Sequence, residues 1–145
     1  MEIRKVSDEF SVSGQLEPDA IAALQAAGVK TLICNRPDNE APDQPAYADL
    51  ARLAHEAGMT VHYLPVVHDT INPQNVEDFS ALLQDATTPV HAWCRTGLRS
   101  ITLWSLAQIK AGANPETQVA TATRLGFDFR SFRDKFASVI ARLKR

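Results

Sequence analysis

The sequence predicts an α/β domain in which a central, mostly parallel sheet is flanked by helices. Short β-branched and apolar runs alternate along the chain with amphipathic stretches of about ten to fifteen residues, an order typical of βαβ units. The run at residues 29–34 lacks polar alternation, as expected of a strand covered on both faces. The length of 145 residues, close to the roughly 150 of a typical domain, predicts that residues 1–145 form one domain.

The sequence of the first half of the chain predicts three strands and two helices. The strands are expected at residues 2–6, 10–15 and 29–34. Pro18 begins the first helix, because proline suits the first helical position and acidic neighbours suit the first turn, and Gly28 ends it. The second helix ends before Gly58, and its apolar side chains recur at helical spacing, at Tyr47, Leu50, Ala51 and Ala54.

The second half alternates in the same way. A strand at residues 60–67 precedes a helix that begins at Asn72 and Pro73, and a short strand follows at residues 89–93. The next helix, at residues 100–111, is apolar around most of its circumference, so it should be buried centrally. Two C-terminal helices are expected, at residues 115–125 and 131–143.

The composition is that of an ordinary globular domain. With 45% hydrophobic residues, 22% charged residues and a formal charge of −2, it indicates neither disorder nor a nucleic-acid partner. No apolar run reaches the roughly 18 residues of a membrane span, and the N-terminus lacks the apolar core of a signal peptide, so a cytoplasmic protein is expected. Cys34 and Cys94 are too few for a disulfide framework and are expected as free thiols. The oligomeric state stays open.

Cys94 occupies the most informative position in the sequence. Residues 91–100 predict a strand, a tight loop and a helix, so the thiol lies where backbone N–H groups and the helix dipole stabilise an anion. Such a nest, with Arg95 and Arg99 nearby, favours the thiolate, which is the nucleophilic form. Gly97 permits a turn with positive φ, and the planar guanidinium of Arg99 matches two oxygens of a bound anion.

This region resembles the cysteine-dependent phosphatase and rhodanese superfamilies, and most closely the phosphatase-like domain of the beta-lactamase-hydrolase-like proteins. The resemblance spans nearly the whole chain and rests on Ser13-Gly14-Gln15, Asn35-Arg36-Pro37-Asp38, Leu64-Pro65-Val66, and Cys94 to Ser100 followed by Leu103-Trp104. It implies a dual-specificity-phosphatase-like fold with Cys94 as nucleophile and Arg99 as anion ligand. The anion-binding loop between them is then Arg95, Thr96, Gly97 and Leu98.

Two chemistries are open to this loop. Cys94 and Arg99 enclose four residues, one fewer than a typical phosphatase signature, whereas rhodaneses use the shorter loop. Trp93 also replaces the histidine that phosphatases usually carry before the cysteine. Both departures favour a sulfurtransferase in which Cys94 carries a sulfane sulfur, as a persulfide, to a small thiol or sulfite-like acceptor. The alternatives are a phosphatase acting through a Cys94 phosphocysteine and a non-catalytic module that binds an anionic partner.

The phosphatase alternative gives roles to two further residues. Asp69 lies in the turn after the strand at residues 60–67, where related phosphatases carry the acid that protonates the leaving alcohol, although an ordinary turn aspartate is the simpler interpretation. Ser100 matches the hydroxyl that helps the cysteine leave from the phosphocysteine.

Arg36 and Asp38 follow a strand at the sheet edge that binds ligands in α/β proteins, and are expected at the pocket rim or as a surface pair.

The remaining chemistry-bearing residues predict little more. Cys34 reaches the same sheet edge and is expected as an apolar filler or as a second, resolving thiol. The histidines His62, His68 and His91 lack a metal-binding spacing, so neither a metal nor another cofactor is expected. The expected partners are a small-molecule sulfur donor and acceptor or a phosphorylated substrate, with no nucleic acid and no membrane.

Overall fold

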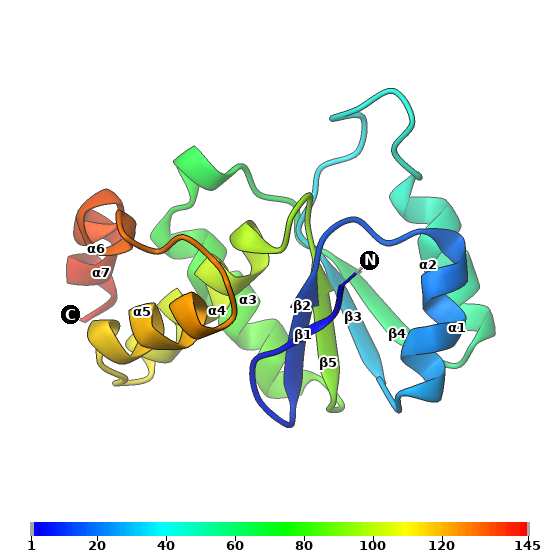
Figure 1. Cartoon of the computed structure of the whole chain (residues 1–145), viewed down its shortest axis with the longest axis horizontal. Helices are drawn as coiled ribbons and strands as arrows, with labels where there is room; N and C mark the ends of the chain where they lie inside the picture. The colour runs from blue at the N-terminus through cyan, green and yellow to red at the C-terminus, as the bar shows by residue number, and fades with distance from the viewer. Residues whose placement is uncertain (1, 145) are drawn as a thin grey trace.

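The computed structural model describes residues 2–144 and contains a five-stranded sheet in the order β1-β2-β5-β3-β4 (Figure 1). The strands are β1 (Arg4–Lys5), β2 (Phe10–Ser13), β3 (Thr31–Cys34), β4 (Thr60–Tyr63) and β5 (Val90–Trp93). β1 pairs with β2 in antiparallel orientation, and the other neighbouring pairs are parallel. The α/β class and the mostly parallel sheet expected from the sequence are therefore confirmed.

Helices cover both faces of the sheet (Figure 1). One face carries α1 (Pro18–Ala26) and α2 (Tyr47–Glu56), and the other carries α3 (Pro73–Asp85), α4 (Leu98–Lys110), α5 (Pro115–Arg124), α6 (Phe132–Lys135) and α7 (Ala137–Leu143). Each face has its own buried apolar cluster, and both β3 and β5 are buried along their whole length. Within residues 2–144, no helix is both long enough and apolar enough to cross a membrane.

The strand order determines where the candidate site lies. β5 lies between β2 and β3, and the three strands are parallel. The loops that follow these strands therefore meet at one edge of the sheet, which is the edge where open α/β sheets bind ligands. These loops hold the turn at residues 14–17, the segment at residues 35–46 and the cysteine loop at residues 94–97.

β4 is shorter than the strand that the sequence predicts at residues 60–67. Pro65 has no N–H and so cannot continue the ladder. Beyond it, the N–H of Val66 still donates to the carbonyl of Asn35 (3.0 Å), which keeps this segment beside the end of β3. The chain then enters η1 (His68–Thr70), a single 3₁₀ turn.

The helix expected at residues 131–143 is instead two short helices, α6 and α7. The break lies at Phe136, whose backbone angles are φ −106° and ψ 18°. Phe132 and Phe136 are both buried, with ring centroids 5.7 Å apart, and Phe129 stacks on Phe132 at 4.6 Å. Packing of these rings against the core overrides the helical periodicity from which one helix was predicted.

Candidate active site

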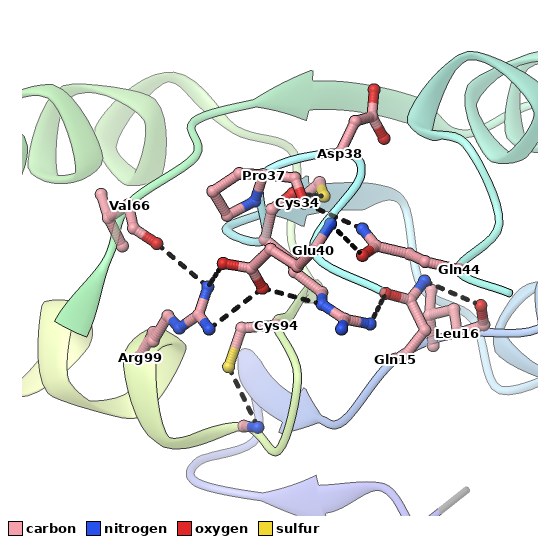
Figure 2. Close-up of polar contacts among 12 residues, drawn as sticks. Gln15, Leu16, Cys34, Pro37, Asp38, Glu40, Gln44, Val66, Cys94 and Arg99 are labelled. Atoms are coloured by element: carbon pink, nitrogen blue, oxygen red, sulfur yellow. Dashed lines mark hydrogen bonds and ion pairs between the residues drawn. The ribbon is translucent and has the colours of Figure 1, made fainter. Parts of the chain in front are cut away.

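Cys94 lies at the carboxyl end of β5 and begins a loop that Gly97 closes. Gly97 precedes the first residue of α4 with φ 97°, the left-handed conformation that the sequence predicts for this glycine. Its backbone N–H donates a hydrogen bond to Sγ of Cys94 (3.1 Å; Figure 2). A donor in this position stabilises negative charge on the sulfur. Cys94 itself is buried.

The turn after β2 packs directly on this loop. The N–H of Cys94 donates to the carbonyl of Ser13, and the N–H of Gln15 donates to the carbonyl of Arg95, both at 3.3 Å. A Cβ on Gly14 would lie 2.9 Å from the Arg95 carbonyl oxygen. Because that neighbour is backbone rather than a flexible side chain, only glycine fits at this position.

Arg99, in the first turn of α4, holds a carboxylate beside Cys94 (Figure 2). Its Nη1 donates to Oε2 of Glu40 at 2.9 Å, and its Nη2 donates to Oε1 of the same carboxylate at 3.1 Å. Nη1 also donates to the carbonyl of Val66 at 3.2 Å. The guanidinium is thus fixed in the two-pronged geometry that suits a bound oxyanion.

Arg36 binds the same carboxylate from the other side. Its Nε donates to Oε1 of Glu40 at 3.0 Å and its Nη1 donates to Oε1 of Gln15 at 3.0 Å. Partial burial alone would raise the pKa of Glu40, but hydrogen bonds and charge from Arg99 and Arg36 outweigh it and hold the pKa below its usual value. Glu40 is therefore an ionised carboxylate between two arginines.

Sequence reasoning did not identify Glu40. It lies in the irregular segment between β3 and α2, where no periodicity indicates the direction of a side chain. The one available signal is its spacing, four residues after Arg36 and directly beyond the Asn35-Arg36-Pro37-Asp38 segment. Arg36, which the sequence places at the pocket rim or in a surface pair, shares the Glu40 carboxylate with Arg99.

A buried polar group lies beneath the loop, on β5. His91 is fully buried and pairs through Nδ1 with Oγ of Ser11 (2.7 Å) and through Nε2 with Oγ of Ser13 (2.8 Å). Since Ser13 donates its own proton to the carbonyl of Gly14, His91 donates from Nε2 and accepts from Ser11 at Nδ1. Burial lowers the pKa of His91 to about 3, so the ring is neutral.

Asp69 lies in η1 and faces solvent. Its carboxylate is paired with Nζ of Lys135 from α6, and its Oδ1 lies 3.8 Å from Nδ1 of His68. The hydrogen bond and charge of Lys135 hold the pKa of Asp69 below its usual value. Arg99 binds the carbonyl of Val66 three residues earlier, so the Asp69 segment is attached to the candidate site through its backbone.

Asp38 contacts the start of α2. Its Oδ1 accepts from the N–H of Tyr47 at the start of α2 (2.9 Å), and Figure 2 shows its side chain directed away from Cys94. A carboxylate at a helix N-terminus is stabilised there, which explains this orientation. Of the loop residues, Arg95 and Thr96 are exposed and Leu98 is half-buried.

Cys34 is a buried neighbour of the site rather than part of its polar cluster. Its Sγ donates to the carbonyl of Arg36 at 3.3 Å. Burial raises the pKa of Cys34 to about 12, so this thiol is protonated at neutral pH. The structure thus favours the expected apolar filler over a resolving thiolate.

Comparison with known proteins identifies the family. The sequence model of the family described as "Beta-lactamase hydrolase-like protein, phosphatase-like domain" matches residues 2–111. The beta-lactamase hydrolase-like protein of Agrobacterium fabrum is 31% identical over 112 residues, which make up 77% of this chain and 26% of that protein. The chain therefore spans about a quarter of the length of this relative.

Solved structures share the fold. A candidate phosphatase from Neisseria meningitidis is 33% identical, with a TM-score of 0.87 over 96% of this chain and 99% of its own. TpbA of P. aeruginosa, in complex with phosphotyrosine, is 20% identical, with a TM-score of 0.73 over 98% of this chain and 87% of its own. The same fold occurs in Tk-PTP and PTPMT1, each at a TM-score of 0.78. The expected dual-specificity-phosphatase-like fold is confirmed.

These similarities also bear on the reaction. They support a cysteine-dependent, phosphatase-like domain, and none of them supports the sulfurtransferase that the short loop led us to expect. The family match runs from β1 to the end of α4 and includes both Cys94 and Arg99. On this match, the chain belongs to the family of phosphatase-like domains of the beta-lactamase hydrolase-like proteins.

Proposed function

We propose that the protein hydrolyses phosphomonoesters through a phosphocysteine formed on Cys94. The observation that carries this proposal is the bidentate hold of Arg99 on the carboxylate of Glu40 beside Cys94. A guanidinium in this orientation would offer two donors to an oxyanion next to the sulfur nucleophile once the Glu40 carboxylate releases them. The 33% identity with a candidate phosphatase over nearly the full length of both chains supports the same reaction class.

In the first step, Sγ of Cys94 attacks phosphorus as a thiolate. An S–P bond forms while the bond between phosphorus and the leaving oxygen breaks. Asp69 transfers a proton to that oxygen, so that the alcohol or phenol departs neutral. The donors of Arg99 and the N–H of Gly97 stabilise the negative charge on the reacting groups.

In the second step, water attacks the phosphorus of the phosphocysteine. The carboxylate of Asp69, which lost its proton in the first step, accepts one from this water. The S–P bond breaks, inorganic phosphate is released, and Cys94 departs as a thiolate that again accepts the hydrogen bond from Gly97. Ser100 follows Arg99 directly and is the further residue that we assign to this departure.

Aryl phosphates are the substrate class to test first. The TpbA structure holds phosphotyrosine, whose phenolic leaving group is easier to expel than an alkyl alcohol. Sulfur transfer is a second candidate, because four residues between Cys94 and Arg99 form a shorter loop than that of a typical phosphatase.

One parallel experiment separates these functions. Turnover of phosphotyrosine and of p-nitrophenyl phosphate is measured beside turnover of glutathione persulfide with cyanide. Cys94→Ser serves as the blank and Cys34→Ser as the matched cysteine control, and mass spectrometry of acid-quenched protein identifies the adduct on Cys94. We expect phosphoester turnover and a phosphocysteine in the wild type and in Cys34→Ser. Faster persulfide turnover without any phosphocysteine would establish sulfur transfer instead, and no turnover of either kind would leave an anion-binding module.

A further inference from the structure

The Glu40 carboxylate occupies a position between two guanidinium groups. Its Oε2 accepts from Nη1 of Arg99, while its Oε1 is shared by Nη2 of Arg99 and Nε of Arg36, at 2.9, 3.1 and 3.0 Å respectively. The two guanidinium groups that hold this carboxylate supply the positive charge and the planar donors that a phosphoryl group would require. Figure 2 shows the carboxylate of Glu40 and the guanidinium of Arg99 beside Cys94.

Burial makes Arg36 dependent on an anion. Its side chain is 7% exposed, against 15% for Arg99 and 23% for Glu40. A buried guanidinium without a counter-charge is costly, and within residues 2–144 the ion pair recorded for Arg36 is the one with Glu40. Its other partner, the amide oxygen of Gln15, is neutral. Any ligand that displaces Glu40 from Arg99 must therefore also compensate Arg36.

The backbone around Glu40 allows such an exchange. Arg36 lies two residues after the end of β3 and is anchored by Gln15, whereas Glu40 lies four residues further along an irregular segment. This segment, cyan in Figure 1, extends beyond the carboxyl edge of the sheet before α2 begins. The N–H of Glu40 donates to Oε1 of Gln44 at 3.1 Å, which holds the backbone of this segment. The exchange therefore requires only that the Glu40 side chain rotate away from the arginines, while Arg36 stays in place.

The short cysteine loop indicates a chemical role for Arg36. Four residues separate Cys94 from Arg99, so the loop offers fewer backbone N–H groups than a typical phosphatase loop. We propose that Arg36 supplies the missing donors: a phosphoryl group displaces the Glu40 carboxylate and is held by Arg36 and Arg99 together. This inference rests on the proposed phosphatase function and names Glu40 as the internal anion that the substrate replaces.

The proposal predicts opposite effects for the two members of the ion pair. Glu40→Gln keeps the size and the acceptor oxygen but removes the competing charge, so inorganic phosphate should bind several-fold, up to about tenfold, more tightly. Arg36→Gln removes a charged donor, so phosphate should bind at least about tenfold more weakly. If Glu40 and Arg36 only hold the structure together, both substitutions weaken binding.

Isothermal titration with inorganic phosphate measures these affinities, and thermal unfolding shows which variants fold. The exposed ion pair of Arg52 and Glu56 provides matched controls, Arg52→Gln and Glu56→Gln, which should bind phosphate like the wild type. If Arg36→Gln does not fold, Arg36→Lys replaces it, because lysine keeps the charge but cannot offer a planar pair of donors. Glu40→Gln binding phosphate no more tightly than the wild type would overturn the proposal, as would a folded Arg36 variant with unchanged affinity.

The outcome is separable from that of the proposed function. Opposite shifts in phosphate affinity, combined with no phosphoester turnover by the wild type, would support the two-arginine anion site and reject the phosphatase. Phosphoester turnover through a phosphocysteine, combined with weaker phosphate binding in both variants, would support the phosphatase and reject the displacement of Glu40 by phosphate.

Discussion

The hydroxyl of Ser100 donates a hydrogen bond to Oδ1 of Asn35 at 2.8 Å, and both residues are fully buried. The amide of Asn35 in turn donates to the carbonyl of Leu64 at 2.9 Å. These two bonds connect the first turn of α4, the end of β3 and the segment after β4. Ser100 therefore anchors the helix turn that carries Arg99, and its single hydroxyl proton must leave Asn35 before it can assist the departure of Cys94.

Ser100→Ala should lower the free energy of unfolding by about 1–3 kcal/mol, because it leaves Oδ1 of Asn35 buried without a donor. Urea unfolding measures the change. Ser105→Ala is the matched control on the same helix, since the buried hydroxyl of Ser105 has no hydrogen-bond partner among residues 2–144 and its removal should cost little. Equal losses in the two variants would contradict the anchoring role. Accumulation of a phosphocysteine in Ser100→Ala would show that the hydroxyl also assists the departure of Cys94.

Gly14→Ala should lower kcat/KM by about ten- to a hundredfold. The added Cβ would lie 2.9 Å from the carbonyl oxygen of Arg95, so the turn after β2 must move away from the cysteine loop. Gly112→Ala is the control: its φ of 106° strains the backbone, but no atom lies within 4 Å of the new Cβ. We expect Gly112→Ala to lose stability and keep its activity against p-nitrophenyl phosphate. Similar activities in the two variants would show that the contact with Arg95 is unimportant.

Element order and the conformation of Gly97 could be predicted from sequence because both are local. Proline at a helix start, apolar periodicity, and glycine between a strand and a helix act over a few residues. The break at Phe136 could not be predicted, since it depends on which aromatic rings pack together across the core. The hydrogen bonds of His91 with Ser11 and Ser13 could not be predicted either, because they depend on the register between β2 and β5.

The candidate site also has one part that could be predicted from the sequence and one part that could not. Cys94 and Arg99 are close in sequence, so the loop between them can be recognised without a structure. Glu40 joins them from a separate, irregular segment, and its position depends on the order of β5 and β3 in the sheet and on the buried charge of Arg36. The carboxylate of Asp38 accepts from the start of α2, a contact that adjacency to Arg36 does not indicate.

His91 should make stability depend on pH. Burial lowers its pKa in the folded protein to about 3, against about 6.5 in the unfolded chain. Below about pH 6.5 the unfolded chain therefore binds a proton that the folded protein does not, and stability falls as the pH falls. This contributes a loss of about 2 kcal/mol between pH 6.5 and pH 5.

Urea unfolding at these two pH values checks this effect. His91→Gln cannot titrate, so its stability should change less between them than that of the wild type, even if it is less stable at both. The exposed His55, changed to Gln, is the control and should keep the slope of the wild type. An equal slope in His91→Gln would mean that other groups cause the pH dependence.

Cys34 should resist alkylation in the folded protein. Burial raises its pKa to about 12, so almost none of it is thiolate at pH 8, and iodoacetamide reacts with thiolates. Peptide mass spectrometry after a timed reaction should show modification of Cys94 ahead of Cys34. Unfolding in urea should expose both thiols and serves as the control for reactivity. Rapid labelling of Cys34 in the native protein would revive the interpretation of Cys34 as a resolving thiol.

The last prediction concerns the ion pair of Asp69 and Lys135. The hydrogen bond and charge of Lys135 hold the pKa of Asp69 low, and a general acid must be protonated to act. Lys135→Met should raise this pKa, so the decline of kcat/KM on the alkaline side should move to higher pH. Asp69→Asn should remove the decline and reduce hydrolysis of an alkyl phosphate by about 10²–10⁴-fold, while sparing p-nitrophenyl phosphate more. Lys110→Met, at the exposed end of α4, is the control and should keep the profile of the wild type. Unchanged profiles in both Lys135→Met and Asp69→Asn would show that Asp69 is an ordinary turn residue.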